Sequence, residues 1–166
     1  VYVNNSSEFV MSGEAIIEGC QAISNSANGG GVYVNSSSSF VMSEKAKIEG
    51  CQAISNSSKS SKGGGIHLSN NTKFTLSGSA VIQNCTAKNS ANPGEAYGGG
   101  VSAANVKEIT LEGNASIAGC AAANGSGLYI TGVQNNSNYG NLYANGGSVD
   151  DDVVLGDHEN YPCTIT

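Results

Sequence analysis

Four cysteines recur at one position of a repeated segment, and cysteine sulfur can form disulfides or bind metals. Cys20, Cys51, Cys85 and Cys120 each lie 19 residues after the start of a repeat block. If the blocks stack as β-strands, neighbouring cysteines lie about 4.8 Å apart, which a disulfide accepts. One row of sulfurs gives a line and not a tetrahedron, which argues against zinc. The ladder therefore predicts small buried side chains or cross-coil disulfides, and the fifth cysteine, Cys163, argues against complete pairing.

A second candidate group is acidic. All four aspartates fall in one short segment with a histidine and a glutamate: Asp150, Asp151, Asp152, Asp157, His158 and Glu159. Clustered carboxylates suit Ca²⁺ or a catalytic acid–base pair. The spacing lacks an EF-hand loop, and three successive carboxylates on a strand cannot all face one ion. We interpret the segment as a solvated acidic turn, with Asp150, Asp152 and Asp157 as the weaker metal alternative.

Aromatic residues mark a third candidate site. The residue after each block start is predicted to point outward, and these residues are Tyr2, Tyr33, His67, Ser102 and Tyr129. Stacked rings on a β-wall can hold sugar rings, because a ring face offers flat apolar area beside a polar tip. Tyr2, Tyr33, His67 and Tyr129 are therefore candidate ligand-binding residues, with His67 expected to be exposed. The alternative is ordinary packing along a surface ladder.

These candidates are positioned by an internal repeat. Blocks begin at Val1, Val32, Ile66 and Val101, and a fifth begins at Leu128. The distance from block start to cysteine is constant, whereas 12, 15, 16 and 8 residues separate each cysteine from the next start. The constant part is typical of a wall of stacked strands, and the variable part of a projecting loop. Glycine triplets precede the second, third and fourth blocks, where tight turns need them.

Identical positions within a block alternate by two and are rich in Val, Ile and Phe, which indicates β-strands. In the second block these strands are expected near residues 32–34, 40–42 and 46–48. The sequence thus predicts an all-β fold, a right-handed single-stranded parallel β-helix. It would have four to five coils of 31–35 residues and three strands per coil. A left-handed form would show a six-residue period, and none is present.

The organisation expected is one repeat region over residues 1–140, followed by residues 141–166 as a C-terminal cap or the start of another module. Val1 enters directly at a strand, without the glycine triplet that precedes later blocks. Further coils of a longer parent protein are therefore expected at the N-terminal end.

Composition excludes several functional classes. The chain has 166 residues, with 23 Gly, 24 Ser and 20 Asn, and its charged fraction is only 12%. The net charge of −6 and the absence of arginine argue against nucleic-acid binding. No apolar run approaches the roughly 18 residues of a membrane span, so no membrane insertion is expected. No cofactor motif is present.

The glycine triplet before Val32-Tyr33-Val34, with Phe40-Val41-Met42-Ser43 and Gly50-Cys51-Gln52-Ala53 after it, resembles a known repeat. It is similar to the β-helical repeats of bacterial cell-surface and autotransported proteins, including polymorphic outer-membrane-protein repeats. Cysteine stands where those repeats more often have Asn, and the Phe-x-x-Asn motif of the chlamydial members is missing. The resemblance covers residues 1–130. It implies an extracellular or surface-displayed adhesin or stalk, with no catalytic residues to transfer.

Three functions are compatible with these features. The first is a non-enzymatic surface module that presents loops to a glycan or host-surface ligand. The second is a polysaccharide lyase or hydrolase, suggested only because that chemistry occurs on the same fold. The third is ice binding, but the aligned Thr75 and Thr110 have Val10 and Val41 as their equivalents, so the ladder it needs is broken. We favour the first.

Overall fold

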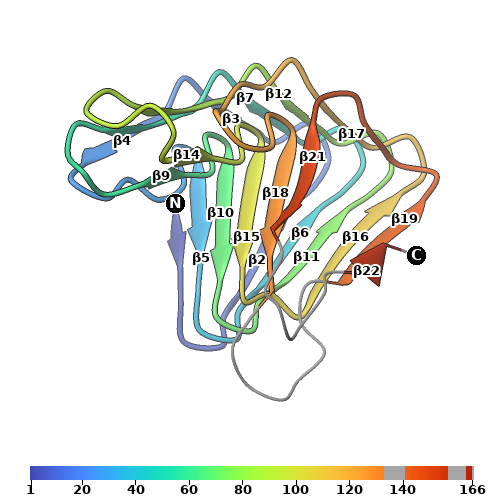
Figure 1. The fold of residues 1–166 in the computed structure, drawn as a ribbon. Coiled ribbons are helices and arrows are strands. Elements are labelled where there is room, and N and C mark those ends of the chain that lie inside the picture. The colour runs from blue at the N-terminus through green and yellow to red at the C-terminus, as the bar shows by residue number, and fades with distance from the viewer. Residues whose placement is uncertain (133–140, 157–163, 166) are drawn as a thin grey trace.

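The computed structural model describes residues 1–132, 141–156 and 164–165, and in these ranges it contains strands and no helix. Neighbouring strands pair in parallel, and the sheets enclose one core along a common axis (Figure 1). The parallel β-helix predicted from the repeat is confirmed. Over the described ranges no helix could cross a membrane.

Three long sheets form the walls. Sheet A contains β1 (Tyr2–Val3), β5 (Val32–Val34), β10 (Ile66–Ser69), β15 (Val101–Ala104), β18 (Leu128–Thr131) and β21 (Val153–Gly156). Sheet B contains β2 (Glu8–Met11), β6 (Ser39–Met42), β11 (Lys73–Leu76), β16 (Glu108–Glu112), β19 (Asn141–Asn145) and β22 (Thr164–Ile165). Sheet C contains β3 (Ile16–Glu18), β7 (Lys47–Glu49), β12 (Val81–Gln83), β17 (Ser116–Ala118) and β20 (Ser148–Val149).

Equivalent residues of successive coils pair directly. Val32 pairs with Ile66, Ile66 with Val101, and Val101 with Leu128. We number the coils 1 to 5 from their starts at Val1, Val32, Ile66, Val101 and Leu128. This register keeps each inward apolar position in line with the same position on both sides, because a one-residue slip would turn the whole set outward.

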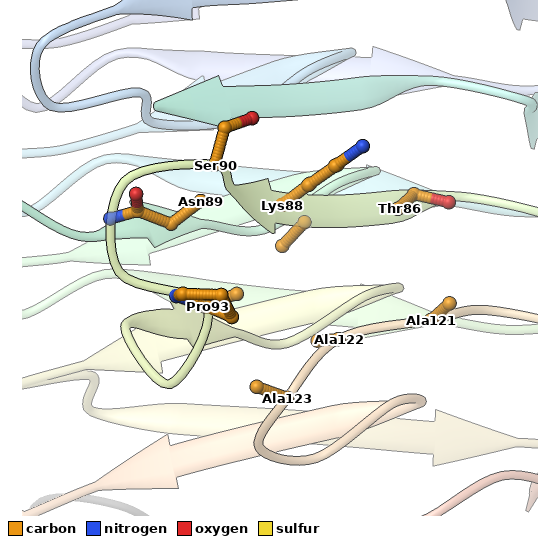
Figure 2. A pocket seen from close by; sticks show the side chains of 10 residues that line it. Thr86, Lys88, Asn89, Ser90, Pro93, Ala121, Ala122 and Ala123 are labelled. Atoms are coloured by element: carbon orange, nitrogen blue, oxygen red, sulfur yellow. The ribbon is translucent and has the colours of Figure 1, made fainter. Parts of the chain in front are cut away.

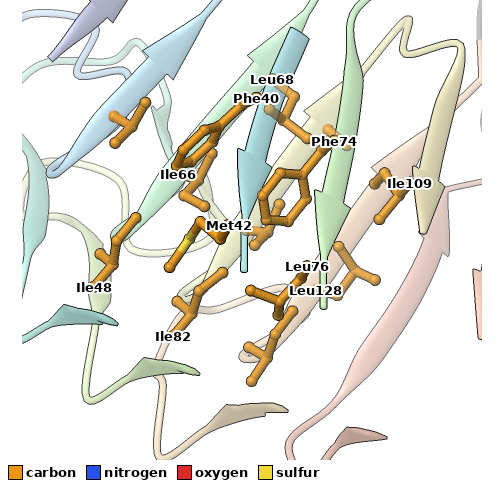
Figure 3. Close-up of a cluster of buried hydrophobic side chains, with 14 of the residues drawn as sticks. Phe40, Met42, Ile48, Ile66, Leu68, Phe74, Leu76, Ile82, Ile109 and Leu128 are labelled. Atoms are coloured by element: carbon orange, nitrogen blue, oxygen red, sulfur yellow. The ribbon is translucent and has the colours of Figure 1, made fainter. Parts of the chain in front are cut away.

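The inward ladders make the core. Phe40 and Phe74 are fully buried, with ring centroids 5.3 Å apart, and Ile48 and Ile82 lie across the interior from them (Figure 3). Burying each such side chain contributes about 1.5–3 kcal/mol. Phe9 of coil 1, at the end of the stack, is only half-buried.

The stacked turns explain the unusual composition. Positive φ angles recur at equivalent turn positions, and glycine and asparagine adopt them at least cost. Between sheets A and B these residues are Asn5, Ser6, Ser36, Ser37, Asn70, Asn71 and Asn105. The abundance of Gly, Asn and Ser therefore follows from repeating the same turns in every coil and is not a sign of disorder.

The coils hold more strands than the three expected. A fourth strand follows the cysteine in coils 1 to 3 and forms sheet D: β4 (Gln21–Ser24), β8 (Gln52–Ser55) and β13 (Thr86–Asn89). A short fifth strand forms sheet E: β9 (Ser61–Lys62) and β14 (Ala96–Tyr97). The expected loops are thus partly strands. Their inward residues are small, such as Ala53 and Ser55, so the apolar alternation that reveals a strand is weak.

Sheets D and E form a lobe beside the main stack, which projects to the left in Figure 1. We call residues 21–28, 52–62 and 86–97 the lobe. Its interior is filled by small side chains, including Ala27, Ala53, Ala87 and Ala96. The two longest connections therefore project on the same side and pair with each other through Ala96 and Ser61.

The segment expected as a cap or new module continues the same sheets. Asn141–Asn145 extends sheet B, and Val153–Gly156 extends sheet A, where Val153 pairs with Leu128. Asp150–Asp152 takes the place that a glycine triplet holds before earlier coils. Coil 5 passes from β20 straight to β21 and adds nothing to the lobe.

Candidate functional site

The outward ladder of sheet A divides into two parts. Tyr2, Tyr33 and His67 stack in series, with ring centroids 5.1 Å apart at both steps. Ser102 then interrupts the row, and Tyr129 instead packs against Tyr97 of the lobe, with ring centroids 4.9 Å apart and ring planes tilted by 43°. The predicted ligand-binding residues therefore lie on one wall but do not form one continuous surface.

A groove of about 250 Å³ lies where the lobe meets this wall. We call it the lobe groove. Two tyrosine rings, one ammonium, one carboxylate and three hydroxyls line it, together with one methyl group: Tyr97, Tyr129, Lys62, Glu95, Ser60, Ser102, Thr131 and Ala104. Flat apolar rings beside several hydrogen-bonding groups are the combination that small polar ligands require.

A tight reversal at the glycine triplet places the lobe over the wall. Gly63 has φ +65°, and a Cβ on it would lie 2.0 Å from the carbonyl oxygen of Ile66. Only glycine permits this approach, which turns β9 back over the start of β10. Lys62 and Tyr97 immediately precede their triplets and are partners in sheet E. They are thereby held above the outward residues of sheet A.

His67 is buried, with 4% of its surface exposed, which corrects the expectation of an exposed histidine. Its Nδ1 lies 3.1 Å from the carbonyl oxygen of Ser102. Burial first, and then the positive charge of Lys62, lower the pKa of His67 to about 3. The imidazole is therefore neutral at physiological pH and packs in the wall as an uncharged ring against Tyr33.

Glu95 and Tyr97 are linked within the groove. The Tyr97 hydroxyl donates a hydrogen bond to Glu95 Oε2 at 3.0 Å. Burial, followed by the hydrogen bond and charge of Glu95, raises the pKa of Tyr97. The phenol thus stays protonated and fixes the carboxylate at one side of the groove.

The cysteine ladder is present as free thiols and lies in the core from coil 2 onward. Cys51, Cys85 and Cys120 are buried, and Cys20 is exposed because coil 1 is at the end of the stack. The thiol of Cys85 lowers the pKa of Cys51 to about 6, against the effect of burial. The sulfurs of Cys120 and Cys51, and then burial, raise the pKa of Cys85 itself. In the structure, Cys51, Cys85 and Cys120 pack as part of the hydrophobic core.

The thiols should differ sharply in reactivity. In a Cys163→Ser background, a thiol reagent should modify Cys20 rapidly in the folded protein and reach Cys51, Cys85 and Cys120 only after unfolding, because burial blocks access. Absorbance with an aromatic disulfide reagent, in buffer and in guanidinium chloride, measures both phases. Equal rates for all four thiols in buffer would contradict the buried ladder.

The aspartate segment holds no assembled metal site among the residues described. Asp150 and Asp152 are exposed, and Asp157 lies outside the described residues. Asp151 has a structural contact, since its Oδ2 accepts a hydrogen bond from the Cys120 backbone N–H at 2.8 Å. In the described ranges, no three His, Cys, Asp or Glu side chains gather closely enough to bind an ion.

A second groove, of about 530 Å³, lies on the outer face of sheet B, beside Glu108, Glu112 and Tyr143. Lys73 Nζ lies 4.0 Å from Glu108 Oε2. The two carboxylates stand four residues apart on one strand, which separates their backbones by about 13 Å.

Sequence reasoning missed Lys62, Glu95 and Tyr97, because they fall in connections of unequal length. One signal was available. The residues directly before the turn glycines align across coils as Asn28, Lys62, Tyr97 and Asn124, and bridges join Asn28 to Lys62 and Tyr97 to Asn124. Alignment from the glycine turns backward, instead of from the cysteines forward, would have placed them above the wall.

Comparison with protein-family models, curated proteins and solved structures found no match.

Proposed function

We propose that this chain is a non-catalytic, secreted or surface-displayed binding module, and that the lobe groove binds a glycan. The observation that carries the proposal is the pairing of Tyr97 and Tyr129 beside Lys62, Glu95 and the groove hydroxyls. Ring faces stack on the C–H faces of sugars, and hydroxyl, ammonium and carboxylate groups match sugar hydroxyls. The resemblance to bacterial cell-surface repeats supports the extracellular location.

The carboxylates favour binding over hydrolysis. Glycoside hydrolysis uses two carboxyl groups about 5–9.5 Å apart. The lobe groove is lined by one carboxyl group, that of Glu95, which already accepts a hydrogen bond from the Tyr97 hydroxyl. The groove on sheet B is lined by two, Glu108 and Glu112, and Glu108 is paired with Lys73.

A glycan-array and host-matrix screen of the purified chain, with and without Ca²⁺, tests the proposal. Reducing sugar released in the same wells reports any hydrolysis. We expect saturable binding without product. Tyr129→Ala should weaken binding by about tenfold, since a lost aromatic contact costs about 0.5–1.5 kcal/mol.

Tyr2→Ala is the matched control, because Tyr2 lies on the same face of sheet A and does not line the groove. Its affinity should equal that of the unmodified chain. Equal losses in both variants would contradict the lobe groove as the site. Product release would contradict the non-catalytic role.

A further inference from the structure

Sheet D of the lobe ends abruptly after three strands. Coil 4 continues it by a single bridge, between Thr86 and Ala121. Around this bridge the Ala87 N–H donates to the Ala121 carbonyl, and the Ala121 N–H to the Cys85 carbonyl, both at 2.9 Å. The chain then turns away, because only eight residues separate Cys120 from the start of coil 5. A strand that three coils supply is thus missing from the fourth.

The short connection leaves a cavity of about 490 Å³ at the end of the lobe. We call it the lobe-end cavity. It is bounded by the end of β13, the proline turn that follows, and the alanines of coil 4 (Figure 2). Ala87 and Ala96, which belong to the lobe interior, form part of its lining. The cavity therefore lies directly against the small-residue interior of the lobe.

The backbone at this edge carries unused hydrogen-bonding groups. Residues two apart on a strand present their amides to the same side, so Asn89 directs its N–H as Ala87 does, toward coil 4. Within the part of the chain that the structure describes, the Asn89 N–H has no backbone acceptor. The Asn89 side chain is buried and used, since its Nδ2 donates to the Lys59 carbonyl at 2.6 Å.

The strands around the cavity favour an extended strand as its occupant. Sheets A and B continue past coil 4 through β18, β21, β19 and β22, whereas the lobe stops. A second copy stacked end to end would meet these further strands before it reached the lobe edge. A single strand has no such obstruction. Sheet D also fixes the side chains required, because its inward positions are small: Ala53 and Ser55 in coil 2, Ala22 in coil 1.

We propose that the lobe-end cavity binds an extended peptide segment as an additional parallel strand beside β13, with small side chains at alternate positions. The bound strand would accept a hydrogen bond from the Asn89 N–H, beyond the point where Ala121 already accepts one from the Ala87 N–H, and its small side chains would cover the end of the lobe interior. This site is separate from the lobe groove: Ala96 faces the cavity and Tyr97, the next residue, faces the groove.

The chain itself provides the probe. A fluorescein-labelled peptide copying residues 50–57 with Cys51→Ser contains β8, which holds the equivalent position in sheet D two coils earlier. Anisotropy of the peptide, titrated with the full chain, should saturate. The matched control peptide carries Ala53→Lys in addition, which places a charge at an inward position. It should bind at least tenfold more weakly.

Two protein variants test the location. Replacing residues 121–127 with a copy of residues 52–65 supplies the missing strand within coil 4, and Ala122→Leu fills part of the cavity. Both should lose peptide binding while circular dichroism and melting show a folded chain. No saturable binding to the unmodified chain would overturn the proposal. Equal binding of both peptides, or full binding by a folded Ala122→Leu variant, would also overturn it.

Discussion

Gly64→Ala should unfold this protein at far lower denaturant concentrations than any surface substitution. A Cβ at Gly64 would lie 2.4 Å from the Gly99 carbonyl oxygen and from the backbone N and C of Thr86. All three atoms belong to backbone, so no side chain can move aside, and the coils must separate. The expected loss in unfolding free energy is on the order of 4–5 kcal/mol, which is exceptional for one substitution.

Gly50→Ala is the control for this experiment. Gly50 has φ +62°, and its added Cβ would find its nearest neighbour at 4.0 Å. It therefore tests positive-φ strain alone, which costs about 1–2 kcal/mol. Guanidinium unfolding followed by circular dichroism measures both variants. Similar midpoints for the two would show that the triplet does not hold adjacent coils at backbone contact.

Acidification should destabilise the protein through His67. Its pKa is about 3 in the folded chain, against an ordinary value of 6.5. Between these two pH values His67 is protonated in the unfolded chain but not in the folded chain, so the stability of the fold decreases as pH falls. The slope is about 1.4 kcal/mol per pH unit, which gives a loss of about 3 kcal/mol at pH 4.5. Below the folded pKa the loss stops growing.

His67→Asn isolates this effect, because it keeps a polar side chain at the site and removes the titration. Unfolding free energies of both proteins at pH 7, 5.5 and 4.5 should diverge, with the unmodified chain losing more. All other groups titrate in both proteins and cancel in the comparison. Parallel pH profiles would mean that His67 is not buried under the lobe.

The sequence and the structure agree where side-chain volume fixes position. Every coil must fill the same interior cross-section, so the same inward residues recur at the same spacing: Phe40 and Ile48 in coil 2, Phe74 and Ile82 in coil 3. The strand register between coils could be predicted from this constant spacing, since parallel pairing brings equivalent positions of neighbouring coils together. The lobe was harder to predict. Its inward residues, such as Ala53 and Ser55, give almost no hydrophobic signal.

Of the two tyrosines in the lobe groove, the sequence pattern could place one on the wall but not the other. Tyr129 could be placed on the outer wall from the period-two pattern alone. Its partner Tyr97 depends on how a connection of variable length folds back, and this depends on the reversal at Gly98. The burial of His67 has the same origin, because the lobe covers a wall position that the pattern identifies only as outward.

The most direct test of the account is a titration of ring-labelled tyrosine resonances with the strongest glycan from the array, assigned through single Tyr→Phe variants. We expect the signals of Tyr97 and Tyr129 to shift together and saturate at the affinity measured on the array, while Tyr2 stays unchanged. Saturating shifts at Tyr143, on the outer face of sheet B, with none at Tyr97 and Tyr129, would contradict the lobe groove as the binding site.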